Sequence, residues 1–339
     1  MFTTQLRLFR SRLVFSSPLF VTLFLMVGSA ALAADAPEVG FDTTKSGQMP
    51  ITVDGKTVAV YVYEDPKISR PYFAHIKAPD GIQASRNYPP IAGQDLTDHS
   101  TYHPGLWMSF GDISGSDYWR IKARVEHVQC PGAPKGGPGK GTFTVLNHYL
   151  DQQDASKVVC DELCHFTFLV RPEGYLLLWD ATFSSDHEFY FGDQEEMGLG
   201  FRVATPIRVE KNNSRRRASV DGNGTILDSK GRKNEEQIWG NTADWCDYSG
   251  TIDNQHVGMT IFCHPGNFRP SWFHARDYGL LEANPFGREA FGKGEKSKVL
   301  VKPGEKFRLR YGILVHSGPE KSVPDLKAAY ADYLGLTGN

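Results

Sequence analysis

Short runs of β-branched and aromatic residues, separated by turn-forming residues, recur along this chain and constrain its fold most strongly. Residues 57–63 read TVAVYVY and residues 165–170 read HFTFLV, compositions that favour strands. The second run is followed by RPEG at 171–174, which is typical of a type I turn, and then by YLLLWDATF. These segments predict a β-hairpin.

The C-terminal part of the chain shows the two-residue alternation of a strand and then the apolar face of a helix. Residues 307–315 alternate apolar side chains with arginine and glycine, which predicts a strand with one face in the core. Residues 322–336, SVPDLKAAYADYLGL, predict a helix with Ser322 and Pro324 at its start and an apolar side that packs on the outside of the sheets.

These patterns together favour one fold class. Many predicted strands, a single clear helix and no repeat of about 20 to 50 residues argue against a solenoid, a propeller or a Rossmann fold. We therefore predict an all-β fold, a large antiparallel β-sandwich with a short C-terminal helix. Residues 130–141 (CPGAPKGGPGKG) and 211–217 (KNNSRRR) are predicted surface loops.

The N-terminal 33 residues have the composition of a secretory signal peptide. Three arginines precede an apolar run that extends to Val27, and ALA at 31–33 is typical of a cleavage site. We predict cleavage after Ala33, export to the periplasm or the cell exterior, and one β-sandwich domain over residues 34–339. No later run approaches the ~18 apolar residues of a membrane span, so we expect no membrane anchor.

The net charge bears on the class of binding partner, and the cysteine count bears on disulfide pairing. The formal net charge is −2 over 339 residues, which argues against nucleic acid as a partner. An odd number of cysteines leaves at least one thiol unpaired. Their pairing stays open, as does the oligomeric state. The five are Cys130, Cys160, Cys164, Cys246 and Cys263.

Residues 98–119, DHSTYHPGLWMSFGDISGSDYW, concentrate acids, histidines and tryptophans. His99 and His103 share a face on either a helix or a strand, and Pro104 disfavours the helix. The pair can bind a metal with a third ligand such as His75 or Glu196, or serve in acid–base chemistry and sugar contacts. The alternative is two hydrogen-bonded histidines at the edge of the core.

Two further clusters combine aromatic and polar residues. In EEMGLGFR, residues 195–202, neighbouring carboxylates on a strand point to opposite faces. We predict that Glu196 faces the site, because Gly198 leaves room for a ligand beside it. Two surface acids are the alternative. The third cluster is WGNTADWCDY (239–248) with CHPGN (263–267) and WFHARDY (272–278), residue types that suit a sugar. We expect the three clusters to converge on one concave surface.

Several motifs in this order resemble a bacterial family labelled "methane oxygenase PmoA". They include RNYPPIAGQDLTDHSTYHPGLW, EEMGLGFRV, WGNTADWCDYSG and SWFHARDYGLLEANPFG, and the resemblance runs from about Pro71 to Ser317. The label names a membrane subunit, which this chain does not resemble, so we do not take it as chemistry. The family is also similar in strand content to galactose mutarotases, in which a His and a Glu act as acid and base on a sugar. That similarity is one of fold.

The leading hypothesis is a secreted carbohydrate-active protein that performs acid–base chemistry on a glycan or modified sugar, as a hydrolase, lyase or epimerase, without a cofactor. His103 or His274 is the candidate acid and Glu196 or Asp247 the candidate base. The candidate substrate-binding residues are Arg86, His99, Trp107, Trp245, Asp277 and Asn284. One alternative is a non-catalytic sugar-binding protein. Another is an oxygenase or hydrolase that uses a divalent metal bound by His99, His103 and a carboxylate.

Overall fold

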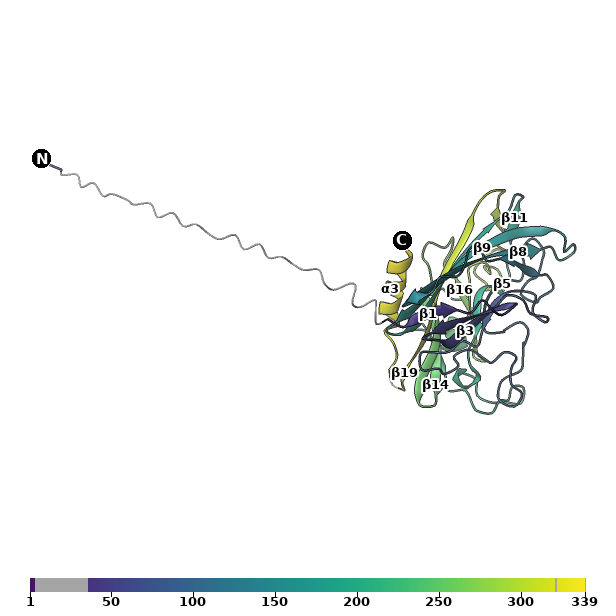
Figure 1. The fold of residues 1–339 in the computed structure, drawn as a ribbon, viewed down its shortest axis with the longest axis horizontal. Helices are drawn as coiled ribbons and strands as arrows, with labels where there is room; N and C mark the ends of the chain where they lie inside the picture. The colour runs from purple at the N-terminus through teal and green to yellow at the C-terminus, as the bar shows by residue number, and fades with distance from the viewer. Residues whose placement is uncertain (4–35, 321, 339) are drawn as a thin grey trace. The chain divides into compact units, whose positions relative to one another are not determined.

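Two large antiparallel sheets form the framework of the computed structural model, which describes residues 1–3, 36–320 and 322–338. From Ala36 onward the chain is one compact unit (Figure 1). Almost all of the predicted signal peptide, residues 4–33, lies outside the described residues. Within the described part of the chain, no helix is long and apolar enough to cross a membrane.

The first sheet has nine strands. Its order is β16 (Trp272–Arg276), β17 (Leu280–Asn284), β12 (Met197–Arg202), β5 (Leu106–Phe110), β4 (Tyr72–Ala74), β3 (Lys56–Val62), β2 (Gln48–Val53), β1 (Glu38–Phe41) and β7 (Gly137–Pro138).

The second sheet has eight strands. Its order is β13 (Thr225–Asp228), β14 (Trp245–Ile252), β15 (Gln255–Cys263), β19 (Phe307–Pro319), β10 (Gly174–Ser184), β9 (Val158–Arg171), β8 (Lys140–Leu150) and β6 (Val125–Gln129). The remaining elements are the pair β11 (Phe189–Phe191) and β18 (Val299–Val301), and the helices η1 (Thr205–Ile207), α2 (Asn234–Ile238) and α3 (Leu326–Thr337).

The all-β sandwich and the hairpin are confirmed. β9 and β10 pair from Arg171 opposite Gly174, so the turn lies where RPEG predicted it. Gly174 has φ +153°, and a Cβ there would lie 2.1 Å from the carbonyl oxygen of Val315. Only glycine fits this close approach of two backbones.

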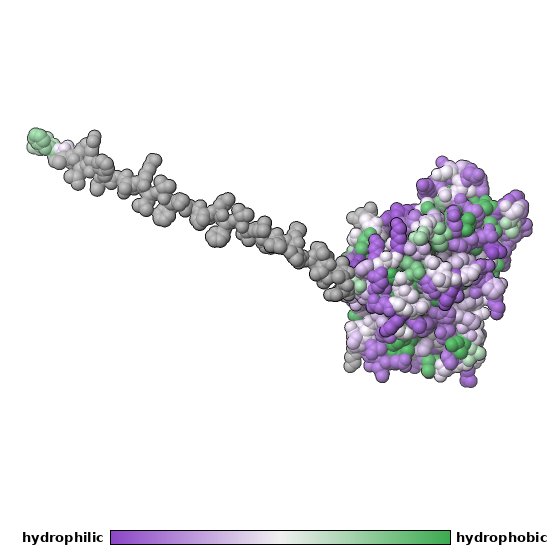
Figure 2. Space-filling view, viewed as in Figure 1, coloured by the Kyte–Doolittle hydropathy of each residue, from purple (hydrophilic) through white to green (hydrophobic). Residues whose placement is uncertain are grey.

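The main core lies between the two sheets because the inward side chains of both are aromatic or aliphatic. Phe73 of the nine-stranded sheet packs against Phe166 and Trp179 of the eight-stranded sheet, with ring centroids 5.2 and 5.6 Å apart. Burial of each such ring contributes about 1.5–3 kcal/mol. Hydrophilic residues cover much of the face seen in Figure 2.

Helix α3 covers part of the outer face of the eight-stranded sheet, as the sequence predicted. Tyr333 packs with Phe262 in a small apolar cluster beneath the helix. The helix begins at Leu326, four residues after the predicted start. Asp325 accepts hydrogen bonds from the backbone N–H groups of Lys327 and Ala328 and so caps the N-terminus.

All five cysteines, in contrast, are free thiols. Cys160 and Cys164 lie on β9, where four residues of strand span about 13 Å, beyond the reach of a disulfide. The sequence left this pairing open.

Candidate functional site

The outer face of the nine-stranded sheet carries an unusual row of side chains. Register pairs place Trp107 opposite Gly200, Gly200 opposite Glu282, and Glu282 opposite His274. The row crosses β5, β12, β17 and β16, three strand spacings or about 14 Å. It brings residues from three distant parts of the sequence together, which confirms part of the expected convergence.

Glu282 is the most deeply buried acid of this row. Its side chain is fully buried, and neither carboxyl oxygen has a hydrogen-bond partner among the described residues. His274 Nδ1 lies 3.3 Å from its Oε2. Burial, together with the nearby charge of Glu196, raises the pKa of Glu282 well above its usual range. The group is therefore held in its protonated, neutral form.

His274 connects this buried acid with the surface. Its Nε2 accepts a hydrogen bond of 2.9 Å from Arg276 Nε and lies 3.3 Å from Glu195 Oε1. The neutral ring therefore carries its proton on Nδ1, which donates to the backbone carbonyl oxygen of Glu195 at 3.2 Å. Burial lowers the pKa of His274, so the neutral ring is the form expected near pH 7.

Glu195 forms the exposed end of this chain, with 35% of its side chain accessible. Its Oε1 accepts hydrogen bonds from Trp239 Nε1, at 2.8 Å, and from the Arg276 guanidinium. Arg276 also pairs with Glu235 at 2.7 Å. Donors of this kind stabilise a carboxylate.

Glu196 lies beside Glu195 rather than on the opposite face, which corrects the prediction. Both residues precede β12 and are not in extended strand conformation, so side-chain alternation does not apply. Glu196 pairs with Arg120 and is 26% exposed. Burial raises its pKa. Gly198 leaves no room for a ligand, since a Cβ there would lie 2.1 Å from the carbonyl oxygen of Ala283.

We call these residues the acid–histidine cluster. Two partly exposed carboxyl groups lie above a buried carboxyl–imidazole pair, and two arginines lie beside them. The cluster comprises Arg120, Glu195, Glu196, His274, Arg276 and Glu282.

His103 lies on the same outer face but is buried, with 3% exposure. Its ring stacks on Trp107 with centroids 5.2 Å apart and on His99 with centroids 5.0 Å apart. Arg202 Nη1 lies 3.4 Å from its Nδ1. Burial and the charge of Arg202 lower the pKa of His103 well below its usual value. This environment does not suit the predicted general acid.

Arg86 is a structural residue rather than a substrate-binding one. It is 1% exposed and donates hydrogen bonds of 3.0, 2.7 and 2.9 Å to the carbonyl oxygens of Leu96, Asp98 and His103. These bonds fix the loop that carries both predicted histidines. The guanidinium therefore uses its N–H donors on backbone carbonyl oxygens and not on a ligand.

Trp107 and Asn284 are also buried and cannot contact a ligand as placed here. Trp107 is 0% exposed within a cluster that includes Trp119. Asn284 donates to the carbonyl oxygens of Gln194 and Glu195 at 2.8 and 2.9 Å. It also accepts two backbone N–H groups with its Oδ1. It positions the segment before Glu196.

His99 and Asp277 are more accessible. His99 is 42% exposed, and its Nδ1 lies 3.0 Å from Asp98 Oδ2. Asp277 Oδ1 accepts the backbone N–H of Glu235 at 2.9 Å, and Asp277 therefore adjoins the acid–histidine cluster through Glu235 and Arg276. Of the predicted sugar contacts, only these two lie at the rim of this face.

Trp245 and Asp247 lie on β14 in the other sheet, so the expectation that all clusters converge is wrong for them. Asp247 is buried and pairs with His316 at 2.8 Å and with Thr260 at 2.7 Å. Trp245 packs against the apolar cluster beneath α3. Sequence proximity to tryptophans did not reveal which sheet the segment joins.

The described residues do not provide a complete set of ligands for the metal site considered above. Among the described residues, no group of three or more His, Cys, Asp or Glu side chains is arranged to hold a metal ion. The rings of His99 and His103 stack on one another, and the Arg202 guanidinium lies at Nδ1 of His103. A cation beside that guanidinium would be repelled.

Residues 48–330 match the model of a family described as "Family of unknown function (DUF6807)". The chain belongs to this family. The PmoA label that the motifs suggested is not shown by the comparisons. No curated protein matches this DUF6807 chain.

Several solved structures are similar to the DUF6807 chain. An α-galactosidase of family GH36 from Geobacillus stearothermophilus, in complex with stachyose, is 11% identical with a TM-score of 0.39, over 77% of this chain and 40% of that one. A galactose mutarotase-like protein from Lactobacillus casei is 9% identical with a TM-score of 0.36, over 82% and 100%. One from Clostridium acetobutylicum gives 9% and 0.34, over 84% and 99%. This chain thus spans less than half of the α-galactosidase.

The sequence-based analysis missed several members of the acid–histidine cluster. Glu282 lies in LLEAN, where it and Asn284 alternate with Leu281 and Ala283. A charged residue inside an apolar strand is a usable signal, because it identifies the face turned away from the core. Arg120 follows a buried tryptophan without any recognisable motif.

Proposed function

We propose that this protein performs acid–base chemistry on a carbohydrate at the acid–histidine cluster. One observation carries the proposal. Glu282 is fully buried without a hydrogen-bond partner among the described residues, yet lies 3.3 Å from His274 Nδ1. An unpaired buried carboxyl is costly for stability, and titratable groups perturbed in this way concentrate at functional sites.

The two accessible carboxyl groups differ in a way that suits opposite roles. Glu196 has a raised pKa and is partly buried, so it can hold a proton and donate it to an oxygen of the sugar. Glu195 accepts hydrogen bonds from Arg276 and Trp239, which hold its carboxyl group in place as the candidate proton acceptor. Environments that separate two neighbouring acids are a usual basis for acid and base assignment.

His274 and Glu282 would support the exchange from below. The imidazole lies between Glu195 Oε1 and Glu282 Oε2, at 3.3 Å from each. The ring fixes the Glu195 segment, because its Nδ1 donates to the Glu195 carbonyl oxygen and its Nε2 accepts from Arg276, the cation that pairs with the Glu195 carboxylate. This arrangement serves hydrolysis, elimination and epimerisation alike, since each needs proton transfer at a sugar oxygen or carbon.

A carbohydrate suits the rim of the cluster. Arg120, Arg276 and the two carboxylates offer donors and acceptors for hydroxyl groups, and the partly buried Trp239 offers an aromatic ring beside them. Export through the predicted signal peptide would place this chemistry outside the cytoplasm. A non-catalytic sugar-binding protein would use the same rim but gives the buried Glu282 no role.

A thermal-shift screen with a panel of sugars and oligosaccharides tests the proposal. A ligand at a hundred times its dissociation constant adds about 2.7 kcal/mol to stability. We expect one sugar class to stabilise the wild-type protein and the Glu282→Gln variant alike, while only the wild type converts it. Glu188→Gln, which changes an exposed acid directly before β11 that is outside the cluster, is the matched control. Stabilisation by no sugar, or full conversion by Glu282→Gln, would refute the proposal.

A further inference from the structure

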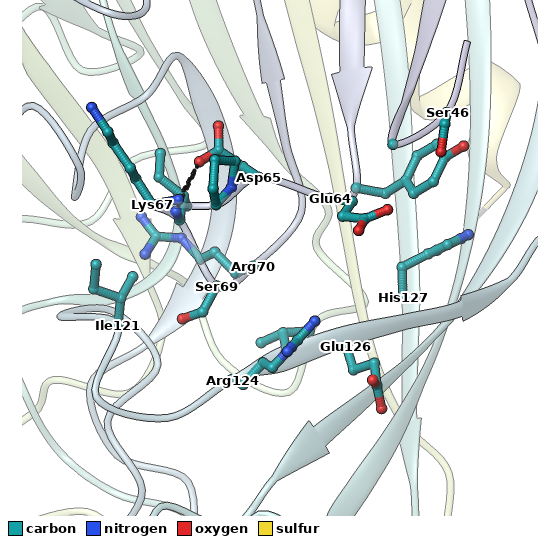
Figure 3. A pocket seen from close by; sticks show the side chains of 15 residues that line it. Ser46, Glu64, Asp65, Lys67, Ser69, Arg70, Ile121, Arg124, Glu126 and His127 are labelled. Carbon is teal, nitrogen blue, oxygen red and sulfur yellow. Dashed lines mark hydrogen bonds between the residues drawn. The ribbon is translucent and has the colours of Figure 1, made fainter.

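A hollow lies beside the C-terminal end of β3. Its volume is about 830 Å³, within the range of roughly 300–1,000 Å³ typical of small-ligand sites. In Figure 3, Lys67 and Ile121 lie on one side of the hollow, and Glu64 and His127 lie on the other. The wall is built from three segments of the sequence, residues 46–47, 63–70 and 121–127.

A smaller cavity of about 300 Å³ adjoins it. The two share the turn at Ser46 and Gly47 and the acids Glu64 and Asp65. The smaller cavity adds His75 and the ring of Tyr88 to the lining, among others. We call the two cavities together the polar groove.

The charges that line the larger cavity are balanced. Three acids and three bases contribute to its wall: Glu64, Asp65, Glu126, Lys67, Arg70 and Arg124. Arg70 and Asp65 are already bonded within the protein, Arg70 to carbonyl oxygens and Asp65 to the Tyr72 hydroxyl.

The other four charged side chains are available to a ligand. Glu64, Lys67, Arg124 and Glu126 are exposed. Among the described ion pairs and side-chain hydrogen bonds, none involves these four side chains. All four line the same open hollow, so a bound molecule can reach several of them at once.

One wall of the groove is rigid and aromatic. The rings of Tyr63 and His127 lie 4.5 Å apart between centroids. His127 Nδ1 lies 3.3 Å from Asn147 Oδ1, and the Asn147 amide donates to the buried Glu162 at 2.9 Å. Since Asn147 Oδ1 can only accept, His127 Nδ1 carries the proton and Nε2 is an acceptor. Sequence analysis of the chain had not placed His127 at any site.

We propose that the polar groove binds a neutral oligosaccharide at a site separate from the acid–histidine cluster. Unpaired carboxylates need hydrogen-bond donors and unpaired ammonium and guanidinium groups need acceptors, and each sugar hydroxyl supplies both. The balanced charge favours neither an anion nor a cation. The tyrosine rings offer a surface for the apolar face of a sugar ring.

The groove and the acid–histidine cluster share no residue, although Arg120 of the cluster directly precedes Ile121 of the groove wall. β3 is four strand spacings from β17, about 19 Å. The buried side chains of Trp107 and Trp119 lie over the strands between them. Binding in the groove therefore requires no step of the proposed chemistry, and either can fail without the other.

The test uses the whole chain and a microarray of neutral, acidic and amino glycans, followed by calorimetric titration of the tightest neutral glycan. Glu64→Ala and Arg124→Ala each remove an exposed charge from the wall, so the fold should stay intact. We expect each to raise the Kd by about tenfold or more, the loss of a charged hydrogen bond. Glu188→Gln is the matched control and should leave the Kd unchanged.

The outcomes separate this inference from the proposed function. If Glu282→Gln leaves the Kd unchanged while Glu64→Ala raises it, the glycan occupies the groove. If Glu64→Ala and Arg124→Ala bind as tightly as the wild type, the inference is wrong. A preference for acidic glycans, or the binding of no neutral glycan, also overturns it.

Discussion

His274 and Glu282 face each other across β16 and β17, with the imidazole Nδ1 3.3 Å from the carboxyl Oε2. The register of two short strands sets this approach, and the carboxyl group is fully buried. Because Asn284, two residues further on, bonds the backbone of Glu195, the same strand also fixes an exposed acid above them. A strand that is apolar on its inner face thus organises the polar chemistry of its outer face.

Glu162 should make stability depend on pH. Burial raises its pKa to about 7 in the folded protein, against about 4.3 in an unfolded chain. The folded state therefore loses stability as the pH rises from about 4 through 7, by roughly 3 kcal/mol. Urea unfolding of wild type and Glu162→Gln at several pH values should show the variant gaining relative stability over this window. A pH-independent difference would contradict the assignment.

Trp107→Ala should cost stability rather than sugar contact. The ring is fully buried between His103 and Trp119, and loss of such a side chain typically costs about 3–5 kcal/mol. Denaturant unfolding measures this cost directly. A variant of normal stability that no longer bound a sugar would restore the stacking role that the sequence suggested.

Asp98→Asn should loosen the loop that carries His99 and His103. Asp98 receives two hydrogen bonds from Arg202, at 2.9 and 3.3 Å. Burial would raise its pKa, but the bonds from His99 and Arg202 outweigh burial and lower it. The stabilisation is therefore present above about pH 4 and lost as the pH falls. We expect Asp98→Asn to cost roughly 2 kcal/mol at pH 7, with the difference from wild type shrinking in acid.

The sequence predicted local structure better than the site. β9, β10 and β19 follow from alternation and from the turn residues at 171–174, which depend only on near neighbours. The predicted helix start at Ser322 was four residues too early. The helix begins after Asp325, whose side chain caps its N-terminus, and not at Pro324. These are properties that a short segment carries by itself.

The site depends instead on which strands become neighbours. Asp247 and Glu196 were both candidates for the base, but β14 joined the other sheet. Arg86 was predicted to bind the substrate, but its guanidinium donates hydrogen bonds to carbonyl oxygens of the loop that follows it. Glu282 is a single acid within the apolar segment LLEAN and was not predicted as a site residue. The pairing of β16 with β17 placed it opposite His274. Long-range pairing decided each of these outcomes.

Asn284→Ala should separate positioning from chemistry. The variant loses the bonds to the carbonyl oxygens of Gln194 and Glu195, so the cluster's carboxyl groups lose their support. We expect kcat on an identified sugar to fall by about tenfold or more while KM changes little, with a shifted pH profile. The Asn284→Asp variant keeps the acceptor for the Phe286 and Gly287 N–H groups but loses the donor to both carbonyl oxygens, so it should not recover the loss. Equal kcat and pH profile in all three proteins would show that Asn284 has no positioning role.

The measurement that tests the central claim most directly is the steady-state conversion of a stabilising sugar by wild type, Glu196→Gln and Glu282→Gln, with Glu188→Gln as the control. Loss of a general acid or base typically lowers the rate by about 10²–10⁴-fold. The account predicts such a fall in kcat for Glu196→Gln, a marked fall for Glu282→Gln, and no change for the control. Full kcat in both cluster variants would contradict acid–base chemistry at this face of the sheet.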